Sequence, residues 1–254
     1  MLEHRVMPIL TIKNNGLYRT VKYRKPKYIG DPINAVKIFN DKEVDELILL
    51  DISEDRKWDN EKVKYYREIS EEAFMPLCFG GRISRIDHAK RIFDSGFEKV
   101  SLNSSAVENP QLISEIANHY GVQSVVVSID ININIFGSAR VYTDLGRKRT
   151  HLRAIDFAKQ AESMGAGELL VTSIQNDGCM CGYNLETIKQ VSESVKIPVI
   201  ANGGAGSFED LLDGIKKGKA HSVAAGSYFV LNGPHRAVLI SCLSSTEVMK
   251  ITEI

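Results

Sequence analysis

The carboxylate of Asp130 is the group in this sequence that is best placed to move a proton. Asp130 ends the apolar run VVVSID, which spans residues 125–130. If this run is a buried strand, its last residue projects into the space beyond the strand, where a carboxylate can act as a general acid or base. We therefore predict a catalytic role for Asp130, the alternatives being a helix cap or a structural salt bridge.

Glycine pairs follow two other apolar runs and predict phosphate binding. The segment GGR contains Gly81 and Arg82, and the segment GGAGS contains Gly203 and Gly204. Glycines let backbone N–H groups approach an anion closely, and the amino terminus of a following helix adds a positive end. Tight turns also use Gly-Gly, but its recurrence beside further donors favours two anions or two ends of one ligand. Those donors are Asn103, Ser104, Gly226 and Ser227.

Two further acids stand at the ends of apolar runs, Asp51 in LLDI and Asp177 in QNDGCMCG. We expect them to orient ligand hydroxyls or to cap loops. The four cysteines are too few for a disulfide framework, so we expect reduced thiols. Cys179 and Cys181 form a C-x-C pair, but no second Cys or His pair lies at zinc-site spacing, and we predict neither a metal nor a cofactor.

The elements that must position these residues alternate between strands and helices. Short apolar runs rich in β-branched residues are separated by segments of helical period, which is typical of parallel βαβ units. The predicted strands begin near Arg5, Glu46, Met75, Glu98, Gln123, Glu168, Ile197 and Ala220. Asp or Ser capping groups open the helical segments 31–42, 84–96 and 207–218, and the last two close on Gly. With 254 residues, we predict one domain, 1–254, an α/β TIM barrel of the (βα)8 type.

The sequence repeats by half a barrel. A shift of about 122 positions lays Pro76 and Gly81 on Pro198 and Gly203. A shift of about 119 places Thr11 opposite Asp130, and the long connections 12–31 and 131–150 follow predicted strands four positions apart. We infer duplicated half-barrels and a ligand site with pseudo-twofold symmetry. Thr11 cannot shuttle protons near neutral pH, so only one half keeps the carboxylate.

The charge balance argues for a small ligand. Lys plus Arg and Asp plus Glu number 32 each, so no basic excess indicates a nucleic-acid or membrane surface. The beginning MLEHRVMPIL has no apolar core of signal-peptide length, and no apolar run approaches a membrane span. We expect a cytoplasmic protein.

These residues resemble the cyclase subunit HisF of imidazole glycerol phosphate synthase over nearly the whole chain. The matching stretches are DELILLDI, KVSLNSSAVENP, VVVSID, GAGELLVTSIQNDG and IPVIANGGAG. The resemblance implies a substrate with a phosphate at each end, and it adds Thr172, Gly178 and Asn202 to the expected substrate ligands. It also implies a reaction in which ammonia from a glutaminase partner closes an imidazole ring and releases an aminoimidazole carboxamide ribonucleotide.

Four charged residues lie at or near the starts of predicted strands, at the bottom of the barrel. They are Arg5, Glu46, Lys99 and Glu168. By themselves they could be ordinary stabilising ion pairs. The resemblance implies that they form the gate that admits ammonia. No Cys-His glutaminase constellation occurs in the chain, so we expect a separate HisH-like glutaminase in a heterodimer.

The chain departs from the HisF pattern at the predicted mouth. Thr11 in ILTI stands where the family has a catalytic aspartate, Arg19 falls near a loop lysine of the family, and Arg82 replaces the third glycine of a GGG turn. We therefore place Thr11 and Arg19 with Asp130 among the candidate catalytic positions, and expect the guanidinium of Arg82 near the first phosphate.

These departures resemble HisF-like paralogues of the WbuZ-type glycosyl amidation branch. That resemblance implies ammonia delivery to a third, sugar-amidating protein in surface-polysaccharide (lipopolysaccharide) biosynthesis. The alternatives are the true cyclase of histidine biosynthesis and a non-catalytic scaffold that conducts ammonia and senses a phosphorylated ligand. Other barrel lyases or isomerases, including the histidine-pathway isomerase, also share features of the duplicated fold.

Overall fold

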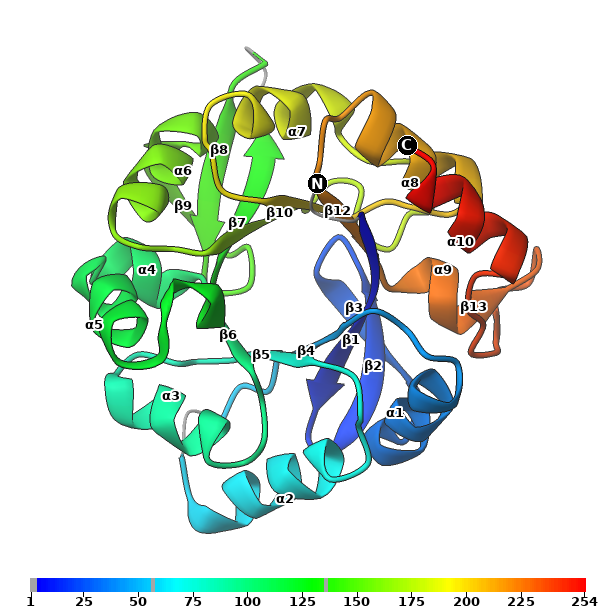
Figure 1. Ribbon diagram of the computed structural model, residues 1–254, viewed down its shortest axis with the longest axis horizontal. Helices are drawn as coiled ribbons and strands as arrows, with labels where there is room; N and C mark the ends of the chain where they lie inside the picture. The colour runs from blue at the N-terminus through cyan, green and yellow to red at the C-terminus, as the bar shows by residue number, and fades with distance from the viewer. Residues whose placement is uncertain (1–3, 56–57, 135–136) are drawn as a thin grey trace.

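Eight parallel strands close into a barrel in the computed structural model, which describes residues 4–55, 58–134 and 137–254 (Figure 1). The strands are β1 (Arg5–Lys13), β4 (Leu47–Asp51), β5 (Leu77–Gly80), β6 (Lys99–Leu102), β7 (Val125–Ile133), β10 (Glu168–Ser173), β11 (Val199–Asn202) and β12 (Ser222–Ala225). Pairing of β7 with β10 closes the ring. The predicted (βα)8 class is confirmed, and each strand begins within two residues of its predicted start. Residues 1–3, in the segment where we expect no signal peptide, lie outside the described residues.

Helices surround the barrel, as Figure 1 shows. They are α1 (Pro32–Asp41), α2 (Asn60–Ser70), α3 (Ile86–Phe93), α4 (Ser104–Glu108), α5 (Gln111–Tyr120), α6 (Ala154–Ser163), α7 (Leu185–Ser192), α8 (Phe208–Lys216), α9 (Ser227–Val230) and α10 (Ser245–Thr252), with a 3-10 turn at Val122–Ser124. Asp31 caps α1 by accepting from the Asn34 N–H, and Ser207 forms a capping box with Asp210 on α8. Both caps are confirmed.

The predicted cap at Ser84 is wrong. Helix α3 has Arg85 at its N-cap position, and no side chain accepts a hydrogen bond there. Ser84 lies one residue too early, and its hydroxyl lies 3.4 Å from Nδ1 of His88. The start of α3 is therefore set by packing, with Ala89 and Ile92 fully buried, and not by a cap.

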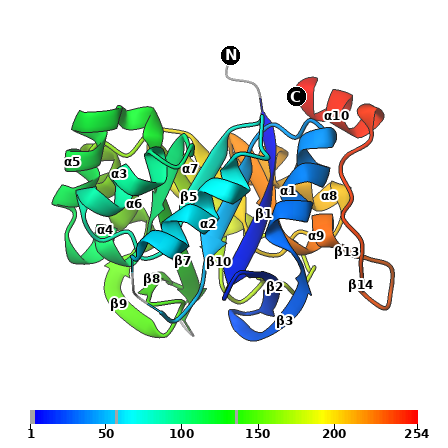
Figure 2. The ribbon, with the colours of Figure 1, turned by 90° about the horizontal axis from the view of Figure 1, so that it is seen from below.

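The two long connections are β-hairpins that extend the barrel at one end. The first contains β2 (Gly16–Val21) and β3 (Arg24–Gly30), and β2 pairs antiparallel with β1. The second contains β8 (Ala139–Thr143) and β9 (Lys148–Arg153), and β8 pairs antiparallel with β7. Figure 2 shows both hairpins at the same end of the barrel. A further short hairpin joins β13 (Leu231–Asn232) to β14 (Ala237–Val238).

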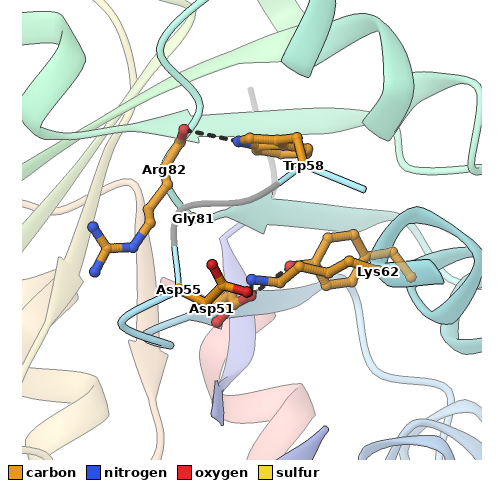
Figure 3. Close-up of a pocket in the computed structure, with 7 residues that line it drawn as sticks. Asp51, Asp55, Trp58, Lys62, Gly81 and Arg82 are labelled. Carbon is orange, nitrogen blue, oxygen red and sulfur yellow. Dashed lines mark hydrogen bonds and ion pairs between the residues drawn. The ribbon is translucent and has the colours of Figure 1, made fainter. Parts of the chain in front are cut away.

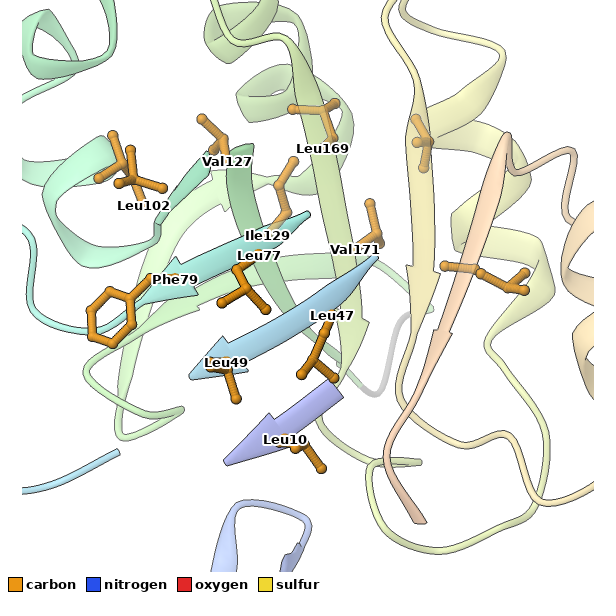
Figure 4. Close-up of a cluster of buried hydrophobic side chains, with 14 of the residues drawn as sticks. Leu10, Leu47, Leu49, Leu77, Phe79, Leu102, Val127, Ile129, Leu169 and Val171 are labelled. Carbon is orange, nitrogen blue, oxygen red and sulfur yellow. The ribbon is translucent and has the colours of Figure 1, made fainter. Parts of the chain in front are cut away.

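The barrel has two apolar cores because successive strand residues point to opposite faces. Along β4, Leu47 and Leu49 belong to the cluster between strands and helices, which Figure 4 shows, whereas Ile48 belongs to the interior cluster. The interior cluster comprises Met7, Ile9, Ile48, Cys78, Val126, Leu170, Ile200 and Ala224, with Leu50 at its edge. The axis of the barrel is therefore apolar, and polar groups gather at its two ends.

Replacing Ser207 with Ala should lower the free energy of unfolding by about 1 kcal/mol, because it removes the capping box of α8. Denaturant unfolding monitored by circular dichroism measures the difference. Ser84→Ala is the matched control and should change stability by less than about 0.5 kcal/mol. Equal losses in the two variants would contradict the assignment of the caps.

Candidate active site

A ring of four charged side chains closes the end of the barrel where the strands begin. Arg5 lies 2.7 Å from Glu46 and 3.0 Å from Glu168, and Lys99 lies 2.7 Å and 3.1 Å from the same two carboxylates. Each acid therefore lies between two cations. The structure brings all four predicted gate residues together, next to the interior apolar cluster.

Burial gives this ring its electrostatic character. Glu46 is 2% exposed, and burial raises its pKa, an effect that the charges of Lys99 and Arg5 oppose. One oxygen of Glu46 and one of Glu168 have no hydrogen-bond partner within the described part of the chain. A buried acceptor without a partner is costly, so both oxygens are able to take a proton donor that enters the barrel here.

At the opposite end, the carboxyl ends of β10, β11 and β12 surround a hollow of about 190 Å³, which we call the β11–β12 hollow. It brings predicted ligands from the second half of the barrel, though not Thr172, together with Arg19 from β2. Its lining residues are Arg19, Asp177, Gly178, Asn202, Gly203, Gly204, Ala205, Ala225, Gly226 and Ser227. The sequence places these residues on four separate segments, and the barrel gathers them.

Arg19 supplies the positive charge of this hollow. Its Nη2 donates to the Ser227 hydroxyl at 3.0 Å and lies 3.8 Å from the Asp177 carboxylate. A Cβ atom on Gly226 would overlap the guanidinium, so only glycine leaves room for it. The Nε of Arg19 has no partner among the described residues, although Arg19 is only 8% exposed. A buried guanidinium with a free donor is suited to an anionic ligand.

The first half of the barrel forms a different hollow, of about 200 Å³, which Figure 3 shows. Asp51 lies in it, but the Asp51 carboxylate is already occupied: it accepts from the Tyr66 hydroxyl and the Ser53 N–H and lies 3.1 Å from Lys62. Asp51 therefore caps its loop, one of the two roles that we expected. Gly81 and Arg82 line the same hollow.

Arg82 and its predicted neighbours do not form a copy of the β11–β12 hollow. The Nε of Arg82 donates to the Ser53 carbonyl at 2.9 Å. Asn103 donates to the carbonyls of Ser128 and Tyr142, and the Ser104 hydroxyl accepts from the N–H of Asp144. Asn103 and Ser104 thus contact β7 and the β8–β9 hairpin and are not among the described residues lining the first hollow.

Asp130 lies within β7 at the barrel mouth, 8% exposed. The Ser128 hydroxyl donates to its carboxylate at 3.0 Å. The pKa of Asp130 is raised to about 7: burial is the main cause, Ser128 and Tyr23 oppose it, and the nearby charge of Asp177 adds a smaller rise. Asp130 is not at a helix terminus and makes no ion pair with a described residue, so neither structural alternative applies. Near neutral pH it can both accept and release a proton.

Thr11, at the position symmetric to Asp130, has a structural role. Its hydroxyl donates to the carbonyl of Tyr18 on β2. Thr172, also predicted as a ligand, accepts a hydrogen bond from Asn202 at 3.1 Å, beside Asp130 in the register of β7 and β10. At the mouth, β7 therefore carries a carboxylate. The matching group on β1 is a hydroxyl that is hydrogen-bonded to the β2–β3 hairpin.

Tyr23 is the site residue that the sequence did not reveal. It lies in the turn between β2 and β3, and its hydroxyl is near enough to Asp130 and Thr172 for both to affect its pKa. Burial, followed by the charges of Asp130 and Asp177, raises the pKa of Tyr23 well above its usual value, so its hydroxyl stays protonated. No sequence signal marks it, because the contact requires the hairpin to cross the mouth.

Within the described ranges, no helix is long and apolar enough to cross a membrane, and no three His, Cys, Asp or Glu residues gather as a metal site would require. All four cysteines are free thiols.

Comparison with known proteins places this site in a family. The model of the family described as "Histidine biosynthesis protein" matches residues 5–233. A protein of Pseudomonas aeruginosa named "Putative imidazole glycerol phosphate synthase subunit hisF2" is 45% identical over 241 residues, which are 95% of this chain and 96% of that protein. The chain belongs to the HisF family.

Other relatives agree. A hisF3 protein of Vibrio vulnificus under the same description is 42% identical over 255 residues, 100% of this chain and 98% of its own length. The imidazole glycerol phosphate synthase subunit HisF of Alkaliphilus metalliredigens is 38% identical over 232 residues, 91% of this chain and 92% of its own. The resemblance to HisF is confirmed, and the chain is a HisF-type synthase subunit.

The raised pKa of Asp130 makes the stability of this HisF-family barrel depend on pH. Between about pH 4 and pH 7 the folded chain keeps a proton on Asp130 that the unfolded chain has released, so the free energy of unfolding falls as pH rises. Asp130→Asn removes this effect. The variant should be more stable than the wild type above pH 7, by at most about 4 kcal/mol, with no such gain below about pH 4.

Denaturant unfolding at a series of pH values measures this difference. Asp156→Asn is the control, because Arg153 beside Asp156 lowers its pKa and the sign of its contribution is therefore opposite. A stability difference for Asp130→Asn that does not change between pH 4 and pH 8 would contradict a protonated Asp130.

Proposed function

We propose that this HisF-family chain is the synthase subunit of a glutamine-dependent amidotransferase. It receives ammonia from a HisH-like glutaminase at the ion-pair ring and delivers it at the barrel mouth for amidation of a phosphorylated or sugar substrate. The observation that carries the proposal is the arrangement of one barrel: a charged ring at one end, an apolar axis, and Arg19 with Asp130 at the other.

The two ends of the barrel have complementary chemistry for an ammonia path. The free acceptor oxygens of Glu46 and Glu168 can take hydrogen bonds from ammonia at the entrance. The apolar interior beyond them disfavours a charged ammonium ion and admits the neutral molecule more readily. Ammonia would therefore leave its proton at or before the ring and reach the mouth as a nucleophile.

The β11–β12 hollow supports binding of a phosphate. The Gly203–Gly204 loop, Ser227 and Arg19 line one small space, and the Arg19 guanidinium donates to the Ser227 hydroxyl there. Phosphate accepts several hydrogen bonds at once and prefers bidentate arginine. A phosphate there would compete with Asp177 for Arg19. The Arg19–Asp177 ion pair is weak because its atoms lie 3.8 Å apart, so replacing Asp177 by phosphate as the partner of Arg19 costs little free energy.

Asp130 is the group that we assign to proton transfer. When ammonia adds to an electrophilic carbon, the new nitrogen carries an extra proton, which the ionised Asp130 can accept. The same carboxylic acid can then protonate the oxygen that leaves as water. A pKa of about 7 suits both steps, since neither form is strongly favoured near neutral pH.

We further propose that the acceptor belongs to sugar amidation in surface-polysaccharide biosynthesis, with a third protein carrying the sugar chemistry. Two observations support this branch. Thr11 replaces the second carboxylate and is held by Tyr18, and the numbered names hisF2 and hisF3 describe two of the similar proteins.

The second candidate is the true cyclase that forms imidazole glycerol phosphate and aminoimidazole carboxamide ribonucleotide. It is favoured by the retained Asp130 and by the similarity to the Alkaliphilus subunit. The third is a scaffold that conducts ammonia and senses a phosphorylated ligand, for which Arg19 alone would suffice.

Turnover of the imidazole glycerol phosphate precursor separates these candidates. The chain, co-purified with its glutaminase, should not consume the precursor at the rate of an authentic HisF, with glutamine or with ammonium salts, and should amidate a phosphorylated or nucleotide-linked N-acyl sugar when the third protein is added. Turnover at the authentic rate would contradict the sugar branch and support the cyclase. Product formation that survives Asp130→Asn would support the scaffold.

Arg19→Met should weaken binding of inorganic phosphate by about tenfold or more, because it removes a charge-assisted hydrogen-bond donor from the β11–β12 hollow. Isothermal titration calorimetry at fixed ionic strength measures the affinity. Arg153→Met, which removes an exposed arginine on the other hairpin, is the control and should leave the affinity within about twofold. Equal affinities for both variants would count against a phosphate site at Arg19.

A further inference from the structure

Two cysteines lie one residue apart on the loop that follows β10. Cys179 is half-buried and Cys181 is exposed, whereas Cys78 is buried inside the barrel. Both residues of the pair are therefore reachable from solvent. Neither takes part in the ammonia path, the phosphate site or the proton transfer proposed above. Accessible thiols at this spacing are candidates for oxidation to a disulfide.

The backbone between the two cysteines brings them to disulfide distance. Met180 has φ 58°, in the left-handed region, so the chain turns there and does not run extended. A left-handed turn has the dimensions of an α-helix in mirror image, in which Cα atoms two residues apart are separated by about 5.4 Å. Disulfides span Cα separations of about 4.4–6.8 Å. Rotation of the two side chains is therefore the main change that a bond between Cys179 and Cys181 requires.

The thiols are free to make that rotation. Sγ of Cys179 lies 3.6 Å from the carbonyl oxygen of Gln175 and 3.7 Å from that of Asp177. A thiol is a weak hydrogen-bond donor, so leaving these carbonyls costs little free energy. Partial burial, followed by the nearby Cys179, raises the pKa of the Cys181 thiol. Because the thiolate is the reactive form, the reaction of the pair should become faster as pH rises above neutrality.

The residues on either side of the pair belong to the β11–β12 hollow or contact it. Gly178, which precedes Cys179, lines the hollow. Gly182, which follows Cys181, donates its N–H at 2.9 Å to the carbonyl of Gly204, another lining residue. A bond that draws the two cysteines together therefore acts on the hollow from both ends of the tripeptide.

The contact between this tripeptide and the glycine loop after β11 leaves no space for a shift. A Cβ atom on Gly204 would lie 2.1 Å from the carbonyl oxygen of Gly182, and one on Gly206 would lie 2.5 Å from Cβ of Met180. Closely packed groups transmit displacements to their neighbours. Movement of Met180 and Gly182 must therefore displace the loop that lines the hollow.

We propose that Cys179 and Cys181 form a reversible oxidation site and that the disulfide between them weakens anion binding in the β11–β12 hollow. The oxidant is a low-molecular-weight disulfide. The Cys181 thiolate attacks it, which breaks its S–S bond, forms a mixed disulfide and releases one thiol. The Cys179 thiolate then attacks the Cys181 sulfur and releases the second thiol. The pair loses two electrons and two protons, which the two released thiols carry away.

The small size of the ring makes this oxidation reversible. The disulfide closes a loop of three residues, so it restricts the unfolded chain little and adds little stability. Exposed disulfides have the more oxidising potentials and are readily reduced by other thiols. The state of the pair therefore follows the ratio of thiol to disulfide in its surroundings.

The first part of the test establishes the bond. The full chain is treated at pH 8 with glutathione disulfide, and its free thiols, counted in denaturant with Ellman's reagent, should fall from four to two. Mass spectrometry should show a loss of about 2 Da, the two hydrogens removed, in the peptide that contains both cysteines. Cys181→Ser should not form this bond. Cys242→Ser, which removes another half-buried thiol, is the matched control and should still form it.

The second part measures the coupling to the hollow in reduced and oxidised chain. Oxidation should weaken binding of inorganic phosphate, measured by isothermal titration calorimetry, by about tenfold, the effect of one hydrogen bond to a charged ligand. It should also speed up hydrogen exchange of the Gly182 N–H, a readout that needs no ligand. Dithiothreitol should restore both values. Only the phosphate readout rests on the proposed function.

The outcomes separate the two proposals. Glutathione adducts that persist without a bond between Cys179 and Cys181 would overturn the oxidation site. An oxidised chain with unchanged phosphate affinity and unchanged Gly182 exchange would overturn the coupling. A reduced chain that binds no phosphate, yet exchanges Gly182 faster once oxidised, would support the coupling and contradict the proposed phosphate site.

Discussion

The pairing of β7 with β10 is the interaction on which the site depends, because it closes eight parallel strands into a ring. Because the eight strands are parallel, all of them end at the same mouth, and the β7–β10 pairing sets Asp130 beside Thr172 in register. All strand starts lie at the other end, where the four charges of the ion-pair ring meet. The alternation of side chains then fills the axis with apolar groups between these two ends.

Features that depend on strand position could be predicted from the sequence. The ion-pair ring was predictable because Lys99 and Glu168 open their strands, and the β11–β12 hollow because Gly203 and Ser227 follow theirs. The crossing of the mouth by Tyr23 was not, since it depends on hydrogen bonds of a hairpin to a loop over 150 residues away. The hydrophobic pattern predicts where strands end, but it does not predict where a hairpin crosses the barrel mouth.

The two halves of the barrel share the same arrangement of strands and hairpins and differ in the side chains at the mouth. Both extend their first strand into a hairpin, and the β2–β3 hairpin brings Arg19 to the β11–β12 hollow and Tyr23 near Asp130. Asp51 ends β4 and Asp177 follows β10, but Tyr66 and Lys62 engage the first carboxylate, whereas Arg19 and Thr20 engage the second. The candidate groups therefore gather at the carboxyl ends of the second-half strands, and the first half contributes Arg19 to them.

The central claim is that the charged ring and the mouth are two ends of one ammonia path. It is tested most directly by giving the complex glutamine labelled with ¹⁵N in the amide, together with excess unlabelled ammonium, and measuring the ¹⁵N content of the aminated product. The account predicts a product that is mostly ¹⁵N in the wild type and in the surface variant Lys37→Met, and mostly unlabelled in Lys99→Met, which breaks the ring. A product that follows the isotope ratio of bulk ammonium in the wild type would contradict it.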